Sequence, residues 1–402
     1  MTSRLAAFRE AVRSGFWAVP GGCVLLAIAL ALLLVDVDRR LQTDLAFTFG
    51  AGPDSAREVL SAITTAMITF TGLVFSITIV VLQLTSSQFS PRVLRTFLRD
   101  RLTQYSLGVF TATFVYAVMV LRTVDGGDDS LFVPAISTTV ALGLLVLSVA
   151  LFVAYIHHIA TSMQASSIVA AIGMETRVTL DRRFPAGRAE PVDLPSELPP
   201  DEPASLVVPA RRPGVVTTFE EDRLVALARD ARVVLRTRVR PGNFVPEGAP
   251  LFEVIGSPGS LDVEAVLASV AQGQDRTMQQ DVAFGFRQLA DVGERALSPS
   301  TNDPTTAVQV LDQLHDLLRR LVTRPLRTGM LCDDEGRVRV VLPPDRFEDF
   351  LELALQGIDQ YGREHRPVQE RLDALLADLC AAAVPRHRDA VERYAAERRA
   401  TH

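Results

Sequence analysis

The sequence predicts a membrane α-helical protein, with four transmembrane helices and a cytoplasmic α+β domain that contains a small β barrel and a helical region. Three observations predict this fold class. Four long apolar runs lie in the first 160 positions and contain no Asp, Glu, Lys or Arg. A stretch with six prolines and no apolar periodicity spans residues 182–205. Beyond it, β-branched segments with Pro-Gly and Glu-Gly turns precede segments with apolar residues at three- and four-residue steps.

The four apolar runs are long enough to cross a membrane, which takes about 20 residues in a helix. The third run has 17 residues, and we retain it because omitting it would place a basic and an acidic loop on the same side. After the first run, LLLVDVDRRLQ offers no small-residue cleavage site, so we expect that run to remain as an anchor. The runs are residues 17–35, 59–84, 105–121 and 131–156.

Loop charges predict the orientation in the membrane. Arginines are concentrated before the first run and in the second loop, whereas acidic residues dominate the third loop, RTVDGGDDS. Cytoplasmic loops carry an excess of basic residues. We therefore expect a multi-pass protein of the cell inner (plasma) membrane with both termini in the cytoplasm. The arginines that set this orientation are Arg4, Arg9, Arg13, Arg92, Arg95, Arg99 and Arg101.

Composition argues against several classes of function. All 41 basic residues are arginine, which excludes lysine Schiff bases and the lysine of a phosphate-binding loop. The three cysteines are widely spaced, so a disulfide framework or a cysteine zinc site is not expected. Residues 161–402 hold 30 arginines and 37 acidic residues, a balance that argues against nucleic-acid binding. Catalytic motifs are not recognised. We expect no enzyme activity, no cofactor and no metal site.

The domain organisation follows from the changes in pattern. Residues 206–219 and 232–256 are predicted to form strands, with a short amphipathic helix over residues 222–231 between them. Apolar periodicity then predicts helices over 261–272, 278–297, 304–322, 347–362 and 366–384, with a strand pair near residues 337–342. The expected parts are a transmembrane domain at 1–160, a connecting segment and linker at 161–205, a small β-barrel-like domain at 206–260 and a mainly helical domain at 261–402.

The barrel prediction depends on one repeat. Gly242, Val245, Gly248 and Leu251 recur every three residues, which resembles the hairpin of lipoyl and biotinyl carrier domains and of similar small barrels. Those carriers attach their group to a lysine, and this chain has none. The repeat therefore predicts a structural barrel without a carrier function.

Three sequence blocks resemble a known family. They are SSQFSPRVLRTFLRDRLTQYSLGVFTATFVYAVMVLR, DVAFGFRQLADVGERALSP and NDPTTA. Together they are similar to the predicted bacterial membrane proteins classed as domain of unknown function 2254. The resemblance implies an integral membrane protein and supplies no established activity, so the functional prediction depends on the residues themselves.

The second apolar run carries an unusual number of hydroxyl groups. Helical spacing places one set of small and polar residues on a single face, and a second set, Thr64, Thr71, Thr78 and Thr85, follows a step of seven beside it. Such a face permits close packing of helices in lipid. It also has the composition of a water-filled path formed by several copies. The predicted pore-lining set is Thr65, Thr69, Gly72, Ser76 and Gln83.

The second loop begins with a helix start signal, Ser90 followed by Pro91. Arg92, Arg95 and Arg99 would then share the polar side of an amphipathic helix. Two interpretations remain open: these arginines bind lipid headgroups at the inner leaflet, or they surround the cytoplasmic mouth of a pore.

The stretch RALSPSTNDPTTAVQVL, residues 295–311, is predicted to be a corner between two helices. Asp303 before Pro304 has the form of a helix N-cap followed by proline at the first helical position. The stretch also holds more polar groups than a corner requires. Its candidate contacts to a ligand or a neighbouring subunit are Ser298, Ser300, Asn302 and Asp303.

The predicted function is a homo-oligomeric inner-membrane channel or pore, lined by the second apolar helix and controlled by a cytoplasmic regulatory domain. The absence of Asp, Glu, Lys, Arg and His from the four runs disfavours an ion-coupled transporter more than a passive pore. The alternative is a non-conducting membrane scaffold or sensor whose cytoplasmic domain binds a ligand or a protein. The expected partners are membrane lipid and further copies of the chain, without nucleic acid.

Overall fold

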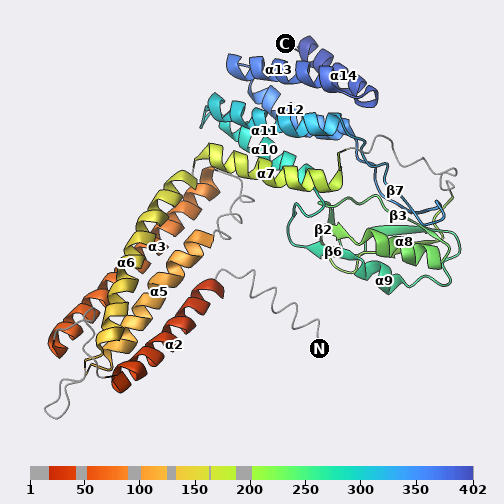
Figure 1. The fold of residues 1–402 in the computed structure, drawn as a ribbon. Helices are drawn as coiled ribbons and strands as arrows, with labels where there is room; N and C mark the ends of the chain where they lie inside the picture. The colour runs from red at the N-terminus through yellow and green to blue at the C-terminus, as the bar shows by residue number, and fades with distance from the viewer. Residues whose placement is uncertain are drawn as a thin grey trace. The chain divides into compact units, whose positions relative to one another are not determined.

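The computed structural model describes residues 18–41, 52–88, 101–124, 133–162, 164–186 and 202–401. The chain divides into two compact units, Met1–Gln164 and Ala165–His402. Each unit is described by itself, with the labels of Figure 1.

The first unit is a group of helices that span a membrane. Within the described residues, four helices are long and apolar enough to do so, as the sequence predicts. Helix α5 packs against α2, α3 and α6, and a larger share of it is buried than of the other three. The helices are α2 (Ala18–Leu41), α3 (Pro53–Gln88), α5 (Arg101–Leu121) and α6 (Ala135–Ser162).

A carboxylate on one helix caps the start of another in this unit. Helix α2 continues past the end of the predicted run, and Asp38 in its last turns is buried. Its oxygens accept hydrogen bonds from the backbone N–H groups of Ile136 (2.9 Å) and Ser137 (3.0 Å) and from the Ser137 hydroxyl (2.6 Å). The Tyr116 hydroxyl donates to the Ser137 carbonyl at 3.0 Å. Donors at the start of α6 are thus satisfied within the protein, where lipid offers no acceptor.

The second unit contains two sheets. One has five strands in the order β1-β5-β3-β8-β7, antiparallel except for the parallel pair β3 and β8, and the other has the order β4-β2-β6. Helix α8 (Glu221–Asp230) packs against β3, β7 and β8. The strands are β1 (Leu206–Pro209), β2 (Gly214–Phe219), β3 (Val234–Arg236), β4 (Phe244–Val245), β5 (Pro250–Ile255), β6 (Val270–Gly273), β7 (Met330–Cys332) and β8 (Val338–Val341).

A closed barrel is not seen among the described strands, so that part of the expected fold is not confirmed. The repeat that suggested it is used differently: Val245 lies in β4 and Leu251 in β5, and these strands belong to different sheets. Gly242 and Gly248 lie in turns at φ of 93° and 78°, a backbone region that glycine adopts without strain. A spacing of three residues therefore marks the turns that separate the two sheets.

The remaining helices of the second unit largely follow the predicted periodicity. Their apolar stripes form buried faces, as for Leu314 and Leu317 in α11, both fully buried. The predicted helix over 261–272 is wrong at its end, because α9 stops at Ala268 and residues 270–273 pair with β2 as strand β6. The helices are α7 (Ala165–Arg183), α9 (Val263–Ala268), α10 (Val282–Ala296), α11 (Pro304–Val322), α12 (Phe347–Tyr361), α13 (Arg366–Ala382) and α14 (Pro385–Thr401).

Helix α7 lies in what the sequence analysis treats as a connecting segment, yet it is built into the second unit. Gly285 of α10 faces Thr176 of α7 so closely that an added Cβ would overlap the threonine side chain. The end of α7 is held by a residue just after α11: the buried Arg324 donates 2.7 Å hydrogen bonds to Asp181 and to the Phe184 carbonyl. Packing at Thr176 and ion pairing at Asp181 together fix the second half of α7.

Candidate functional site

The predicted pore-lining residues lie together on the outward face of α3. Thr65, Thr69, Gly72, Ser76 and Gln83 are all exposed in the single chain. The hydroxyls of Thr65 and Thr69 each donate to the carbonyl four residues earlier on their own helix, at 3.0 Å. Each hydroxyl proton is thereby engaged in a hydrogen bond, and the lone pairs of the hydroxyl oxygen remain available to accept one.

The second row of threonines on α3 has a different role, which the sequence spacing did not separate. Thr64, Thr71 and Thr78 are half-buried and donate to carbonyls of their own helix. The Thr78 hydroxyl also lies 2.9 Å from the hydroxyl of Tyr155, which is fully buried. This row packs within the chain, so the outward row is the one available to a second molecule or to water.

Large apolar side chains flank the outward polar row. Ile68, Leu73, Phe75, Ile79 and Val80 are each between 42% and 57% exposed. A face that combines small polar residues with apolar flanks suits association between helices, because small residues allow close approach and the flanks fill the space beside them. Association of several copies would bring polar rows together.

The loop arginines cannot be placed beside this face. Arg92, Arg95 and Arg99 lie outside the described residues, so both interpretations of them stay predictions. Within the described part of the chain, no cluster of three or more metal-ligating side chains is found.

The predicted corner is present, with Asp303 as its cap. The Asp303 carboxylate accepts from the Thr306 backbone N–H at 3.0 Å and from the Thr306 hydroxyl at 2.6 Å. These hydrogen bonds, the hydroxyl first, hold the Asp303 pKa below its ordinary value. Asn302 adopts a left-handed conformation, with φ of 47°, and the Ser298 and Ser300 hydroxyls lie 3.1 Å apart. The contact to a ligand or subunit stays a prediction.

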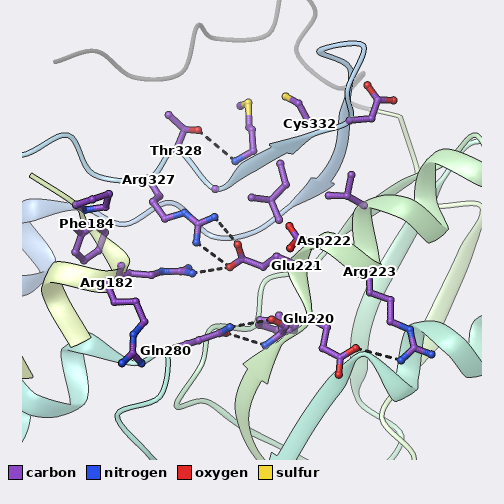
Figure 2. Close-up of a pocket in the computed structure, with 18 of the residues that line it drawn as sticks. Arg182, Phe184, Glu220, Glu221, Asp222, Arg223, Gln280, Arg327, Thr328 and Cys332 are labelled. Carbon is purple, nitrogen blue, oxygen red and sulfur yellow. Dashed lines mark hydrogen bonds and ion pairs between the residues drawn. The ribbon is translucent and has the colours of Figure 1, made fainter. Parts of the chain in front are cut away.

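A large cleft in the second unit was not predicted. It has a volume of about 1310 Å³ and lies between the end of α7, the start of α8 and the segment from Pro325 to Asp334 (Figure 2). Charged groups gather at one wall, where α7 ends and α8 begins. These groups include Arg182, Arg183, Glu221, Asp222 and Arg327.

Two guanidinium groups converge on one carboxylate in this wall. Arg183 donates to Glu221 Oε1 at 2.7 Å, and Arg327 donates to Oε1 and Oε2 at 2.9 and 2.6 Å, as Figure 2 shows for Arg327. Burial disfavours the charged form of Glu221, but the hydrogen bonds and charges of Arg327 and Arg183 outweigh it and lower the Glu221 pKa. The carboxylate is therefore ionised and shared by two cations.

Little in the sequence pointed to these residues. Arg182 and Arg183 lie in a segment that the proline-rich stretch marked as a linker, and Arg327 follows them by more than 140 positions. The one local signal is the run of acidic residues at 220–222, which is favoured at the first turn of a helix. Their meeting is a product of the tertiary fold, and spacing rules do not predict it.

Comparisons with known proteins agree with the resemblance seen in the sequence. A family model described as "Predicted membrane protein (DUF2254)" matches residues 13–378. Two uncharacterized proteins, from Mycobacterium bovis and Mycobacterium tuberculosis, are each 34% identical over 393 residues, which cover 95% of this chain and 74% of the relative. No solved structure matches the chain. The chain therefore belongs to the DUF2254 family of predicted membrane proteins.

Proposed function

We propose that the protein is a homo-oligomeric channel of the inner membrane, with both termini in the cytoplasm and α3 lining the conducting path. The observation that carries the proposal is the exposure of the whole polar row from Thr65 to Gln83 on a helix that spans the membrane. Polar groups that face lipid in a single chain gain hydrogen-bonding partners when copies assemble. An axis surrounded by several α3 helices would be lined by hydroxyl groups.

The hydrogen bonds of this row favour cations as the conducted species. Thr65 and Thr69 donate their protons to their own helix, so they present oxygen lone pairs outward. Oxygen atoms can replace part of the hydration shell of a cation, as rings of carbonyl groups do in selective channels. An anion would need donors, and these two hydroxyls have none left to offer.

Replacement of both Thr69 and Ser76 by Leu tests the proposal. If the row lines a water-filled path, the leucines make the path apolar and dewet it, so cation flux into liposomes is abolished while the oligomer keeps its size. If the row packs between helices, the larger side chains disturb the oligomer. The matched control replaces Ile68 and Ile79 with Leu, which keeps the flanks apolar and should leave flux unchanged. Absence of flux from the unmutated protein at every voltage and with every ion tried would refute the channel.

The cleft of the second unit favours a second candidate, a non-conducting sensor or scaffold. The interiors of folded domains are close-packed and leave few voids. A cleft of about 1310 Å³ lined by charged groups is therefore typical of a ligand-binding site. This candidate predicts ligand binding by the second unit and no flux. The two candidates are separated by measuring flux and binding on the same reconstituted sample.

A further inference from the structure

We propose that the cleft between the end of α7 and the start of α8 binds a small organic anion, with one carboxylate or phosphate group carried on an apolar body. The proposal concerns binding alone and does not depend on whether the protein conducts. Its basis is the unequal distribution of charged and apolar side chains around the cleft.

The wall near α7 offers one guanidinium group to an anion. Arg183 and Arg327 share the single carboxylate of Glu221. Arg182, also exposed to the cleft, makes no hydrogen bond or ion pair with a described residue. Asp345 lines a neighbouring smaller cavity together with Arg183, where burial raises the Asp345 pKa despite the nearby arginines. Glu221 thus engages Arg183 and Arg327, and Arg182 is the guanidinium group of this wall that has no anionic partner among the described residues.

The remainder of the cleft limits how much negative charge a ligand can carry. Asp222 is exposed on α8, and Asp334, whose side chain is 97% exposed, is paired with Arg229 at 3.5 Å. Glu220 is paired with Arg223 at 3.3 Å. A polyanion that extended along the cleft would meet these carboxylates, and like charges repel. A ligand with one anionic group avoids them.

Apolar side chains supply the surface for the rest of the ligand. Val225 and Ala226 on α8 and Met330 and Leu331 on β7 line the cleft, and all four are partly exposed. Ligand sites typically combine such apolar surface with a few polar groups that fix orientation. The volume of about 1310 Å³ accepts a ligand well above the size of a free phosphate ion.

Calorimetric titration of the full chain, in lipid nanodiscs of neutral phosphatidylcholine, tests the proposal. Phenyl phosphate is the main probe, because it carries one anionic group on an apolar ring and remains in water. Inorganic phosphate lacks the apolar body, and ATP carries several charges. We expect saturable binding of phenyl phosphate that is tighter than that of either comparison probe.

Arg182→Gln should weaken phenyl phosphate binding about tenfold or more, since a charge-assisted hydrogen bond contributes that much. Arg182 has no described partner to lose, so folding should be unaffected. Arg393→Gln is the matched control: it removes an equal charge from an exposed site on α14, outside the cleft, and should bind as the unmutated protein does. Three outcomes would each overturn the proposal: no saturable binding of phenyl phosphate, binding of phenyl phosphate to Arg182→Gln as tight as to the unmutated protein, or tighter binding of ATP than of phenyl phosphate.

The anionic group can come from a soluble molecule or from a lipid headgroup. Repeating the titration in nanodiscs that contain phosphatidylglycerol separates these sources. Loss of phenyl phosphate binding there identifies the lipid headgroup as the competing occupant. Undiminished binding identifies a soluble anion as the ligand.

Discussion

The two units of this chain differ in the side chains that they expose. In α2, Leu25 and Leu26 are each 70% exposed, whereas Leu314 and Leu317 in α11 are fully buried. The first unit buries polar groups such as Ser137. Water drives leucines inward in the second unit, but lipid tails are as apolar as leucine and exert no such force in the first. The units are therefore held together by different interactions.

This contrast makes the outward row on α3 an exception within its own unit. Elsewhere the first unit exposes large apolar side chains such as Leu25 and satisfies its buried polar groups inside, as Asp38 and Ser137 do. Thr69 and Ser76 are polar and face outward. Under the channel proposal, this row meets water or another copy of the chain instead of lipid.

The largest expected effect comes from truncating a buried leucine. Leu318→Ala in α11 removes a fully buried side chain and should lower the unfolding free energy of the second unit by about 2–5 kcal/mol. Leu25→Ala on the outward face of α2 should change stability by less than about 0.5 kcal/mol, the usual range for surface sites. Hydrogen exchange of peptides from each helix measures both. Equal losses at the two sites would contradict the contrast between the units.

A smaller effect is expected at the corner before α11. Asp303→Ala should reduce stability by about 0.5–2 kcal/mol at neutral pH, the usual loss for a helix N-cap. The Asp303 pKa is lowered in the folded chain, so its contribution is fully present above the unfolded pKa of about 3.9 and is lost as pH falls through the folded pKa. The difference between the two proteins should therefore shrink in acid. If it persists there, the carboxylate is not the capping group.

Elements with a strong period were predictable from the sequence. The apolar runs predicted the spanning helices, and Asp303 before Pro304 predicted the start of α11. Both signals lie within the segment that they predict. Residues 270–272 were predicted as helix, although pairing with β2 makes them part of strand β6. Helix α7 was missed because a span precedes it and a proline-rich stretch follows it. For strand β6 and for helix α7, tertiary contacts override the secondary-structure preference of the local sequence.

The candidate sites divide in the same way. The polar row on α3 could be found by helical spacing, because one helix carries all of its members. The cleft could not, since Arg183 and Arg327 meet at Glu221 only after three separate segments fold together. A single sequence contains no signal for that meeting.

Water access to the polar row is the most direct test of the channel proposal. In a background with the three native cysteines replaced by serine, Ser76→Cys and Leu73→Cys would each be treated with a charged, membrane-impermeant thiol reagent in reconstituted oligomers. Both residues are exposed on α3, but Ser76 belongs to the polar row and Leu73 to its apolar flank. A water-filled path along the polar row predicts rapid modification at position 76, with loss of cation flux, and little modification at position 73. Equal protection of both positions would contradict it.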